Sequence, residues 1–157
     1  MLELHQFRHS AFCLKVRMLL QAKGLSYRTV EVTPGIGQVA VFRLSGQRQV
    51  PVLVDGDLVL ADSSAIARHL ERREPSPALI PSEPRAAAQM HLLEDWADTT
   101  LAGAARGALV EAAALDPDLR VALLPDDIPD PVRSVMGALP GAWVSNVSEL
   151  VNQSERA

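Results

Sequence analysis

The hydrophobic pattern at the start of the chain changes from strand to helix and back. Residues 2–7 alternate apolar and polar side chains, which is typical of a half-buried strand. From Ala11 the apolar residues recur at helical spacing, in a helix that we expect to begin after an N-cap at Ser10 and to end at Lys23-Gly24. Residues 27–32 alternate again and are rich in β-branched side chains. This β-α-β order predicts two parallel strands joined by a right-handed crossover.

A second group of elements follows. A short helix is predicted around Val39–Leu44. Two apolar runs, residues 51–55 and 58–61, flank Gly56-Asp57 and predict a β-hairpin. Asp62-Ser63 then offers an N-cap for a helix that ends near Arg73. Residues 1–74 are therefore predicted to form an α/β domain of the order βαβ–ββα.

Two proline clusters divide the rest of the chain. The first would break a continuing helix and predicts a linker over residues 75–84. A long amphipathic helix is predicted from near Arg85 to residue 110, and the second cluster separates it from a last helical segment at 132–151. Because no strand pattern occurs here, we expect residues 85–157 to be all-helical. The clusters are Pro75, Pro77, Pro81 and Pro84, and Pro117, Pro125, Pro129 and Pro131.

Composition excludes several classes of function. With 15 Lys and Arg against 19 Asp and Glu, the net charge of −4 gives no general attraction to nucleic acid. The single cysteine, Cys13, excludes an internal disulfide and a Cys-based zinc site, and the scattered histidines predict no metal. The chain has neither a run of about 18 apolar residues nor a signal-peptide pattern, so we expect a cytoplasmic protein without a membrane partner.

Three motifs in a fixed order carry a family resemblance. They are residues 9–17 (HSAFCLKVR), 49–53 (QVPVL) and 57–70 (DLVLADSSAIARHL). Together they resemble the glutathione S-transferase superfamily over roughly residues 1–110, most specifically in the first 74. The resemblance implies a thioredoxin-like N-terminal domain that binds glutathione as a co-substrate. It also implies a helical C-terminal domain that borders the pocket for an electrophilic second substrate, and a homodimer.

The resemblance implies roles for five glutathione-binding residues. The Val50-Pro51 bond is expected to be cis, with the Val50 backbone pairing with the cysteinyl part of glutathione; alone, Pro51 would be an edge-strand proline. Ser63 matches a serine that binds the γ-glutamyl carboxylate, and Asp62 matches a partner residue that is acidic or a glutamine. This pair would also serve as a helix cap. Gln49 aligns with a glutamine that some classes place on the peptide backbone.

The start of the first helix decides which chemistry is available. Ser10 stands where glutaredoxins and thiol-type transferases carry a nucleophilic cysteine, and Ala11 replaces a frequent proline. Ser10 is predicted to stabilise the glutathione thiolate, as in serine-type classes, or to serve only as an N-cap. Cys13 is predicted to be a small packed residue, although a thiol-disulfide oxidoreductase using Cys13 stays an alternative. A non-catalytic binding or scaffold module of this fold is a third possible function.

The helical part contributes further expectations. Phe12, Met90 and Trp96 are predicted to border the second-substrate pocket, with core packing as the alternative role. The family's helical domain is generally longer than the part seen here, so we expect an incomplete second domain. Its apolar helix faces would then be covered by a second copy of the chain or would pack loosely.

Overall fold

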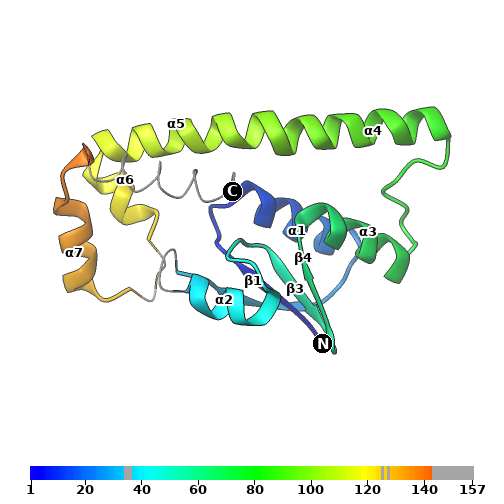
Figure 1. Cartoon of the computed structure of the whole chain (residues 1–157), viewed down its shortest axis with the longest axis horizontal. Helices are drawn as coiled ribbons and strands as arrows, with labels where there is room; N and C mark the ends of the chain where they lie inside the picture. Colours follow the sequence, from blue (N-terminus) through cyan, green and yellow to red (C-terminus); the bar gives the residue numbers. More distant parts are fainter. Residues whose placement is uncertain (34–36, 125, 127, 143–157) are drawn as a thin grey trace. The chain divides into compact units, whose positions relative to one another are not determined.

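The computed structural model describes residues 1–33, 37–124, 126 and 128–142. These residues belong to two compact units, Met1–Trp96 and a second that begins at Ala97. All strands of the described residues lie in the first unit, and the regular elements of the second are helical (Figure 1). The α/β fold followed by an all-helical part, predicted from the sequence, is confirmed.

The first unit is built on a four-stranded mixed sheet of order β2-β1-β3-β4. Its strands are β1 (Leu2–Gln6), β2 (Tyr27–Glu31), β3 (Val52–Asp55) and β4 (Leu58–Ala61). β1 is parallel to β2 and antiparallel to β3, and β3 pairs antiparallel with β4. Gly56 has a φ of +62° in the turn between β3 and β4, a conformation that glycine adopts without a Cβ penalty. The predicted parallel pairing of the first two strands and the predicted hairpin are both present.

Helices cover both faces of this sheet. They are α1 (Ala11–Ala22), α2 (Gln38–Ser45) and α3 (Ser63–Arg73). Leu53 of β3 packs in one cluster with Leu20 of α1 and Ile66 of α3. The adjacent Val52 packs in another cluster with Val41 of α2. Because successive strand residues point to opposite faces, α1 and α3 cover one face and α2 covers the other (Figure 1).

The first unit extends past the predicted linker to include α4 (Pro84–Trp96). The linker is held by two charged side chains of the preceding helices, which we call the Lys23–Glu71 clamp. Lys23 Nζ lies 2.5 Å from Glu71 Oε2 and donates to the carbonyl of Pro77. Glu71 Oε1 accepts hydrogen bonds from the backbone N–H groups of Leu79 and Ile80. The clamp therefore joins residues 77–80 to α1 and α3.

The second unit contains a π-helical segment, η1 (Ala97–Leu101), followed by α5 (Ala102–Leu115), α6 (Pro117–Ala122) and α7 (Asp130–Ala138). A single helix is predicted from Arg85 to residue 110. The structure is helical from 84 to 115, with the π-helical segment η1 in the middle. The sequence pattern does not predict α6, because Pro117 is expected to break a helix. Instead it occupies the first helical turn, where a missing N–H costs nothing, after the N-cap Asp116. α7 covers the first part of the predicted segment 132–151, and residues 143–151 lie outside the described ranges.

Candidate functional site

The strand register gathers the three sequence motifs at one end of the sheet. His5, near the end of β1, pairs with Val52 at the start of β3. Val52 in turn pairs with Ala61 at the end of β4. The segments that continue from these strand ends carry Ser10, the Val50-Pro51 bond and Asp62-Ser63. Backbone pairing alone therefore places the starts of α1 and α3 at the same end of the sheet as the segment that enters β3.

Ser10 is held in a tight turn between β1 and α1. Its N–H donates to the carbonyl of Phe7 over 2.9 Å, which closes a turn over residues 7–10. Its hydroxyl accepts a long hydrogen bond of 3.4 Å from the N–H of Cys13 and so caps α1. A hydroxyl that accepts in this way still has a proton to donate. The half-buried Ser10 is therefore an N-cap that retains a donor.

The Val50-Pro51 peptide bond is cis, which confirms that prediction. Pro51 is buried, and Val50 packs against the cluster of Val41 and Val52 on the α2 face of the sheet. Gln49 is exposed just before them. The expectation that the Val50 backbone faces Ser10 stays a prediction.

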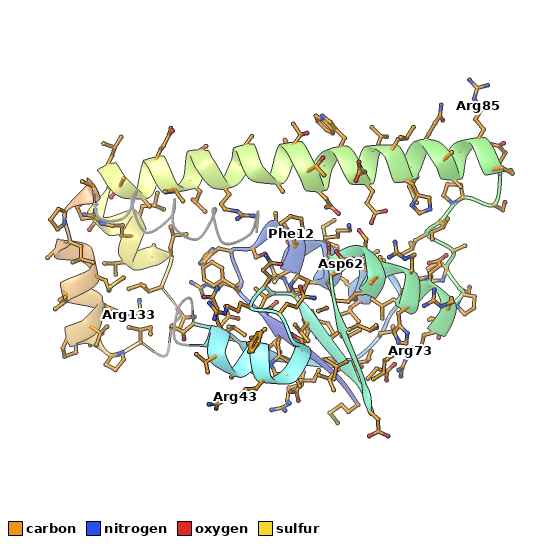
Figure 2. All side chains as sticks on the ribbon, viewed as in Figure 1. Phe12, Arg43, Asp62, Arg73, Arg85 and Arg133 are labelled. Atoms are coloured by element: carbon orange, nitrogen blue, oxygen red, sulfur yellow. The ribbon has the colours of Figure 1, made fainter. Side chains whose placement is uncertain are left out.

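Asp62 and Ser63 begin α3, and Figure 2 shows Asp62 at the start of this helix. Asp62 Oδ1 accepts a 2.7 Å hydrogen bond from the N–H of Ala65, so the predicted cap is present. Asp62 also has φ +85° and ψ 121°, and it is the residue other than glycine with a positive φ in the described chain. Such a conformation costs on the order of 1–3 kcal/mol and is common at ligand sites. Ser63 is 4% exposed in the first helical turn.

Cys13 is a core residue. Its side chain is fully buried on the inner face of α1, beside Val16 and Leu20 in the same helix. Burial raises the pKa of the Cys13 thiol above its ordinary value, and this outweighs the lowering by hydrogen bonds from its surroundings. The thiolate, which is the nucleophilic form, is therefore scarce at neutral pH.

Of the three residues predicted for a second-substrate pocket, one borders the cavity described next. Met90 lines a cavity of about 190 Å³ between α1, α3, residues 79–80 and α4, together with Leu19 and Ile80. Phe12 lies on the first turn of α1 (Figure 2). Trp96 is 53% exposed and ends α4, and neither residue borders this cavity. Ser10 and Ser63 do not border it either. The pocket made by Phe12, Met90 and Trp96 stays a prediction.

A polar cluster on the wall of that cavity links α4 to both helices of the site. Glu94 Oε1 lies 2.7 Å from Lys15 Nζ and accepts a 2.9 Å hydrogen bond from Ser64 Oγ. Burial alone would raise the pKa of Glu94, but the hydrogen bonds from Lys15 and Ser64 bring the pKa below its ordinary value. The cluster fixes α4 against Lys15 of α1 and the first turn of α3.

Sequence reasoning missed a hydrogen-bonded ring beside Ser10. Gln6 is 6% exposed and donates to Glu31 at the end of β2, while Arg17 of α1 donates to Gln6. One signal was available: Leu2, Leu4 and Gln6 share the buried face of β1, so Gln6 is a polar residue in an apolar series. A buried amide requires hydrogen-bond partners, which this position alone would have predicted.

Residues 4–78 match the family model of the glutathione S-transferase N-terminal domain. The N-terminal domain of the chain belongs to the glutathione S-transferase superfamily. The resemblance stated from the three motifs is thereby confirmed, and the sheet with α1, α2 and α3 is its thioredoxin-like fold.

Relatives extend this match. The chain is 36% identical over 118 residues to a stringent starvation protein A homolog of Pasteurella multocida, covering 72% of this chain and 55% of that protein. It is 35% identical over 85 residues to glutathione S-transferase Z2 of Arabidopsis thaliana, covering 52% and 38%. The chain thus spans about half the length, or less, of the curated relatives that it matches.

Solved structures give the same assignment. A glutathione S-transferase from Rhodospirillum rubrum superposes with a TM-score of 0.59 at 31% identity, over 63% of this chain and 46% of that one. Human glutathione transferase theta-2, solved in complex with glutathione, superposes with a TM-score of 0.57 at 25% identity over 62% and 42%.

Two further observations concern membranes and metals. Within the described ranges, every helix is too short or too polar to cross a bilayer. The same residues contain no cluster of three or more His, Cys, Asp or Glu side chains placed to hold a metal ion.

Proposed function

We propose that the chain binds glutathione at the end of the sheet where the three motifs meet and transfers it to an electrophilic small molecule. The observation that carries the proposal is the strand register, which gathers Ser10, the cis Val50-Pro51 bond and Ser63 in a glutathione S-transferase domain. Glutathione bound in the theta-2 relative supports the choice of ligand.

Each part of glutathione has a proposed partner. The backbone of Val50 pairs with the cysteinyl part, in the manner of a strand added to a sheet edge. The N-terminus of α3 with Ser63 takes the γ-glutamyl carboxylate, because free N–H groups and the helix dipole favour an anion there. Asp62 takes the γ-glutamyl amine, and the exposed Gln49 contacts the peptide backbone.

Ser10 is the proposed catalytic residue. Its hydroxyl donates a hydrogen bond to the glutathione sulfur, so that the thiol releases its proton to water more readily. The sulfur lone pair then forms the bond to carbon, and the electrophile expels its leaving group or takes up a proton. A donor that stabilises mainly the thiolate accelerates the reaction rather than merely tightening binding.

The oxidoreductase that uses Cys13 is the less supported alternative. That chemistry needs an accessible thiolate, whereas Cys13 is fully buried with a raised pKa. A non-catalytic module of the same fold is the second candidate. The match to a stringent starvation protein A homolog of Pasteurella multocida is the observation that keeps this candidate.

The test combines calorimetry with a conjugation assay on a halogenated dinitrobenzene. We expect the wild-type protein to bind glutathione and to form the conjugate, and Cys13→Ser to keep both properties. Ser10→Ala should lower kcat about a hundredfold, within the range for one preorganised donor, with little change in glutathione affinity. Ser10→Thr, which keeps the hydroxyl and the cap, should recover much of kcat.

The candidates separate by outcome. Binding without conjugation favours the non-catalytic module. Loss of activity in Cys13→Ser with an active Ser10→Ala would replace the transferase by the oxidoreductase. The electrophile pocket with Phe12, Met90 and Trp96 and a homodimeric state belong to the same proposal.

A further inference from the structure

We infer that Gln6, Arg17 and Glu31 form a hydrogen-bonded ring that positions the turn carrying Ser10. The ring consists of these three side chains and the backbone of Arg8, and we call it the turn ring. The inference rests on the proposed function, in which Ser10 is the catalytic residue. It makes Arg17 and Glu31 positioning residues, which act on the reaction through Ser10.

The turn ring fixes both backbone groups of one turn residue. The N–H of Arg8 donates to Glu31 Oε1 over 2.7 Å, and its carbonyl accepts from Arg17 Nη2 over 3.0 Å. Arg8 is the second residue of the turn that Phe7 and Ser10 close. Two side chains from β2 and α1 therefore hold the peptide groups on either side of one turn residue.

Gln6 closes the ring beneath the turn. Its Nε2 donates to Glu31 Oε2 over 3.1 Å, and its Oε1 accepts from Arg17 Nη1 over 2.9 Å. Gln6 is 6% exposed, so its amide is fixed by the core and cannot be replaced there by bulk water. The buried amide thus sets the distance between the carboxylate and the guanidinium that hold Arg8.

The charges of Arg17 and Glu31 strengthen the hydrogen bonds of the ring, and each of these bonds joins a charged group to a neutral one. In the ring, Arg17 donates to two neutral oxygens, and Glu31 accepts from two neutral N–H groups. Hydrogen bonds with one ionised partner are about twice as strong as neutral ones. Each charged group therefore binds neutral groups of the turn and of β1, which suits a positioning role.

A displaced turn would move the Ser10 hydroxyl away from the thiolate. Ser10 lies two residues after Arg8, and its N–H is bonded to Phe7 within the same turn. A misplacement of about 1 Å is enough to lower a rate about a hundredfold. Glutathione binding depends instead on Val50 and Ser63, which the ring does not touch. Breaking the ring should therefore affect kcat more than affinity.

Three variants test the ring. Arg17→Lys removes the planar two-donor geometry but keeps the charge, and Glu31→Gln keeps the shape but removes one acceptor oxygen. Glu3→Gln is the matched control, because Glu3 pairs with Arg28 across the same two strands outside the ring. Each is measured for melting temperature, glutathione affinity, and the pH profile of kcat/KM in the conjugation assay.

We expect Arg17→Lys and Glu31→Gln to lower kcat between about tenfold and a hundredfold and to move the pH profile to higher pH, with affinity within about threefold of wild type. Glu3→Gln should change none of these. In the Ser10→Ala background, Glu31→Gln should cause little further loss, because residues that act as one unit are not additive. Additive losses, or an unchanged pH profile, would overturn the inference.

Amide hydrogen exchange keeps the test decisive. The Arg8 amide should exchange faster in Glu31→Gln than in the wild type and in Glu3→Gln, with or without glutathione. An unchanged Arg8 amide means that the ring does not hold the turn. A wild-type protein that binds no glutathione would instead refute the proposed function. The exchange rate of the Arg8 amide would still test whether the ring holds the turn. If Glu31→Gln fails to fold, Arg17→Lys supplies the same comparison.

Discussion

At the scale of single residues, Asp62 combines an unfavourable backbone conformation with a helix cap. Its φ of +85° lies where residues other than glycine are rare, although Asp and Asn tolerate positive φ better than most. The 2.7 Å bond from the N–H of Ala65 recovers part of the cost by capping α3. A charge held in such a position at the proposed γ-glutamyl end suggests that binding, and not stability alone, depends on this residue.

Asp62→Asn should separate the two roles. Asn caps a helix about as well as Asp, so the free energy of unfolding should change by less than about 0.5 kcal/mol, while Asp62→Ala should lose about 1 kcal/mol or more. Both variants should bind glutathione at least about tenfold more weakly, because each removes the charge proposed to meet the amine. Denaturant unfolding and calorimetry measure the two effects.

Asp116, the N-cap of α6, provides the control. Asp116→Asn should leave glutathione affinity unchanged. If Asp62→Asn also left it unchanged, Asp62 would be only a cap.

The pH dependence of stability should depend in part on Asp55. Hydrogen bonds from Arg73 and from His69 hold the pKa of Asp55 below its ordinary value of 3.8. The folded state therefore favours the ionised carboxylate. This stabilisation is fully present above pH 3.8 and is lost as the pH falls through the lower folded-state pKa. Asp55→Asn should be less stable than wild type near neutral pH, and the difference should shrink in acid. A difference that stays constant with pH would refute the assignment.

At the scale of elements, the pattern of apolar residues predicts helices and strands best where a single spacing, either that of a strand or that of a helix, dominates a segment. β1, α1 and the β3–β4 hairpin follow from alternation, an N-cap serine and an Asp-Gly turn, all of which act over a few residues. The local pattern does not predict α6, because a proline usually breaks a helix, whereas Pro117 stands at the first helical position, where proline is accepted. The π-helical segment at 97–101 could not be predicted, because the helical spacing of apolar residues does not distinguish a π-helical turn from an α-helical one.

The candidate site was predictable in its motifs but not in its supports. Ser10, Pro51 and Ser63 were found because they lie in short sequence motifs. The turn ring joins Gln6, Arg17 and Glu31 across long sequence separations, and the Lys23–Glu71 clamp does the same. Such contacts depend on strand order and register, which single-sequence periodicity does not determine.

The Lys23–Glu71 clamp gives a prediction about the linker. The Lys23 side chain is 1% exposed, so Glu71→Ala would leave a buried ammonium without its carboxylate. Removing one partner of a buried ion pair costs about 3–5 kcal/mol. The same change frees the N–H groups of Leu79 and Ile80, so the amides of residues 79–80 should exchange faster.

Two comparisons isolate this effect. Glu74→Ala, at the end of the same helix, should change stability by less than about 0.5 kcal/mol. Lys23→Met combined with Glu71→Ala should be more stable than Glu71→Ala alone, because no unpaired buried charge remains. A double variant that is no more stable would mean that the lost packing, and not the charge, causes the destabilisation.

At the scale of the whole molecule, buried apolar residues are distributed unevenly between the two units. Of the twelve buried hydrophobic residues in the described ranges, eleven lie in Met1–Trp96 and one, Ala113, lies in the second unit. In that unit Leu101, Leu115 and Val135 are each more than half exposed. Since burial of apolar area is the main source of folding free energy, the first unit should contain most of the stability.

Amide hydrogen exchange should show this division, and its concentration dependence should show whether a second copy covers the exposed helices. In dilute solution we expect strong protection in β1, β3, α1 and α3, and weak protection in α5, α6 and α7, because little buried area resists local opening there. If the chain forms the proposed homodimer through these helices, their protection should rise with protein concentration while that of the sheet stays constant, since association stabilises only what it buries. Strong protection of α5, α6 and α7 that is independent of concentration would mean that these helices are stable without a partner, and both expectations would be wrong.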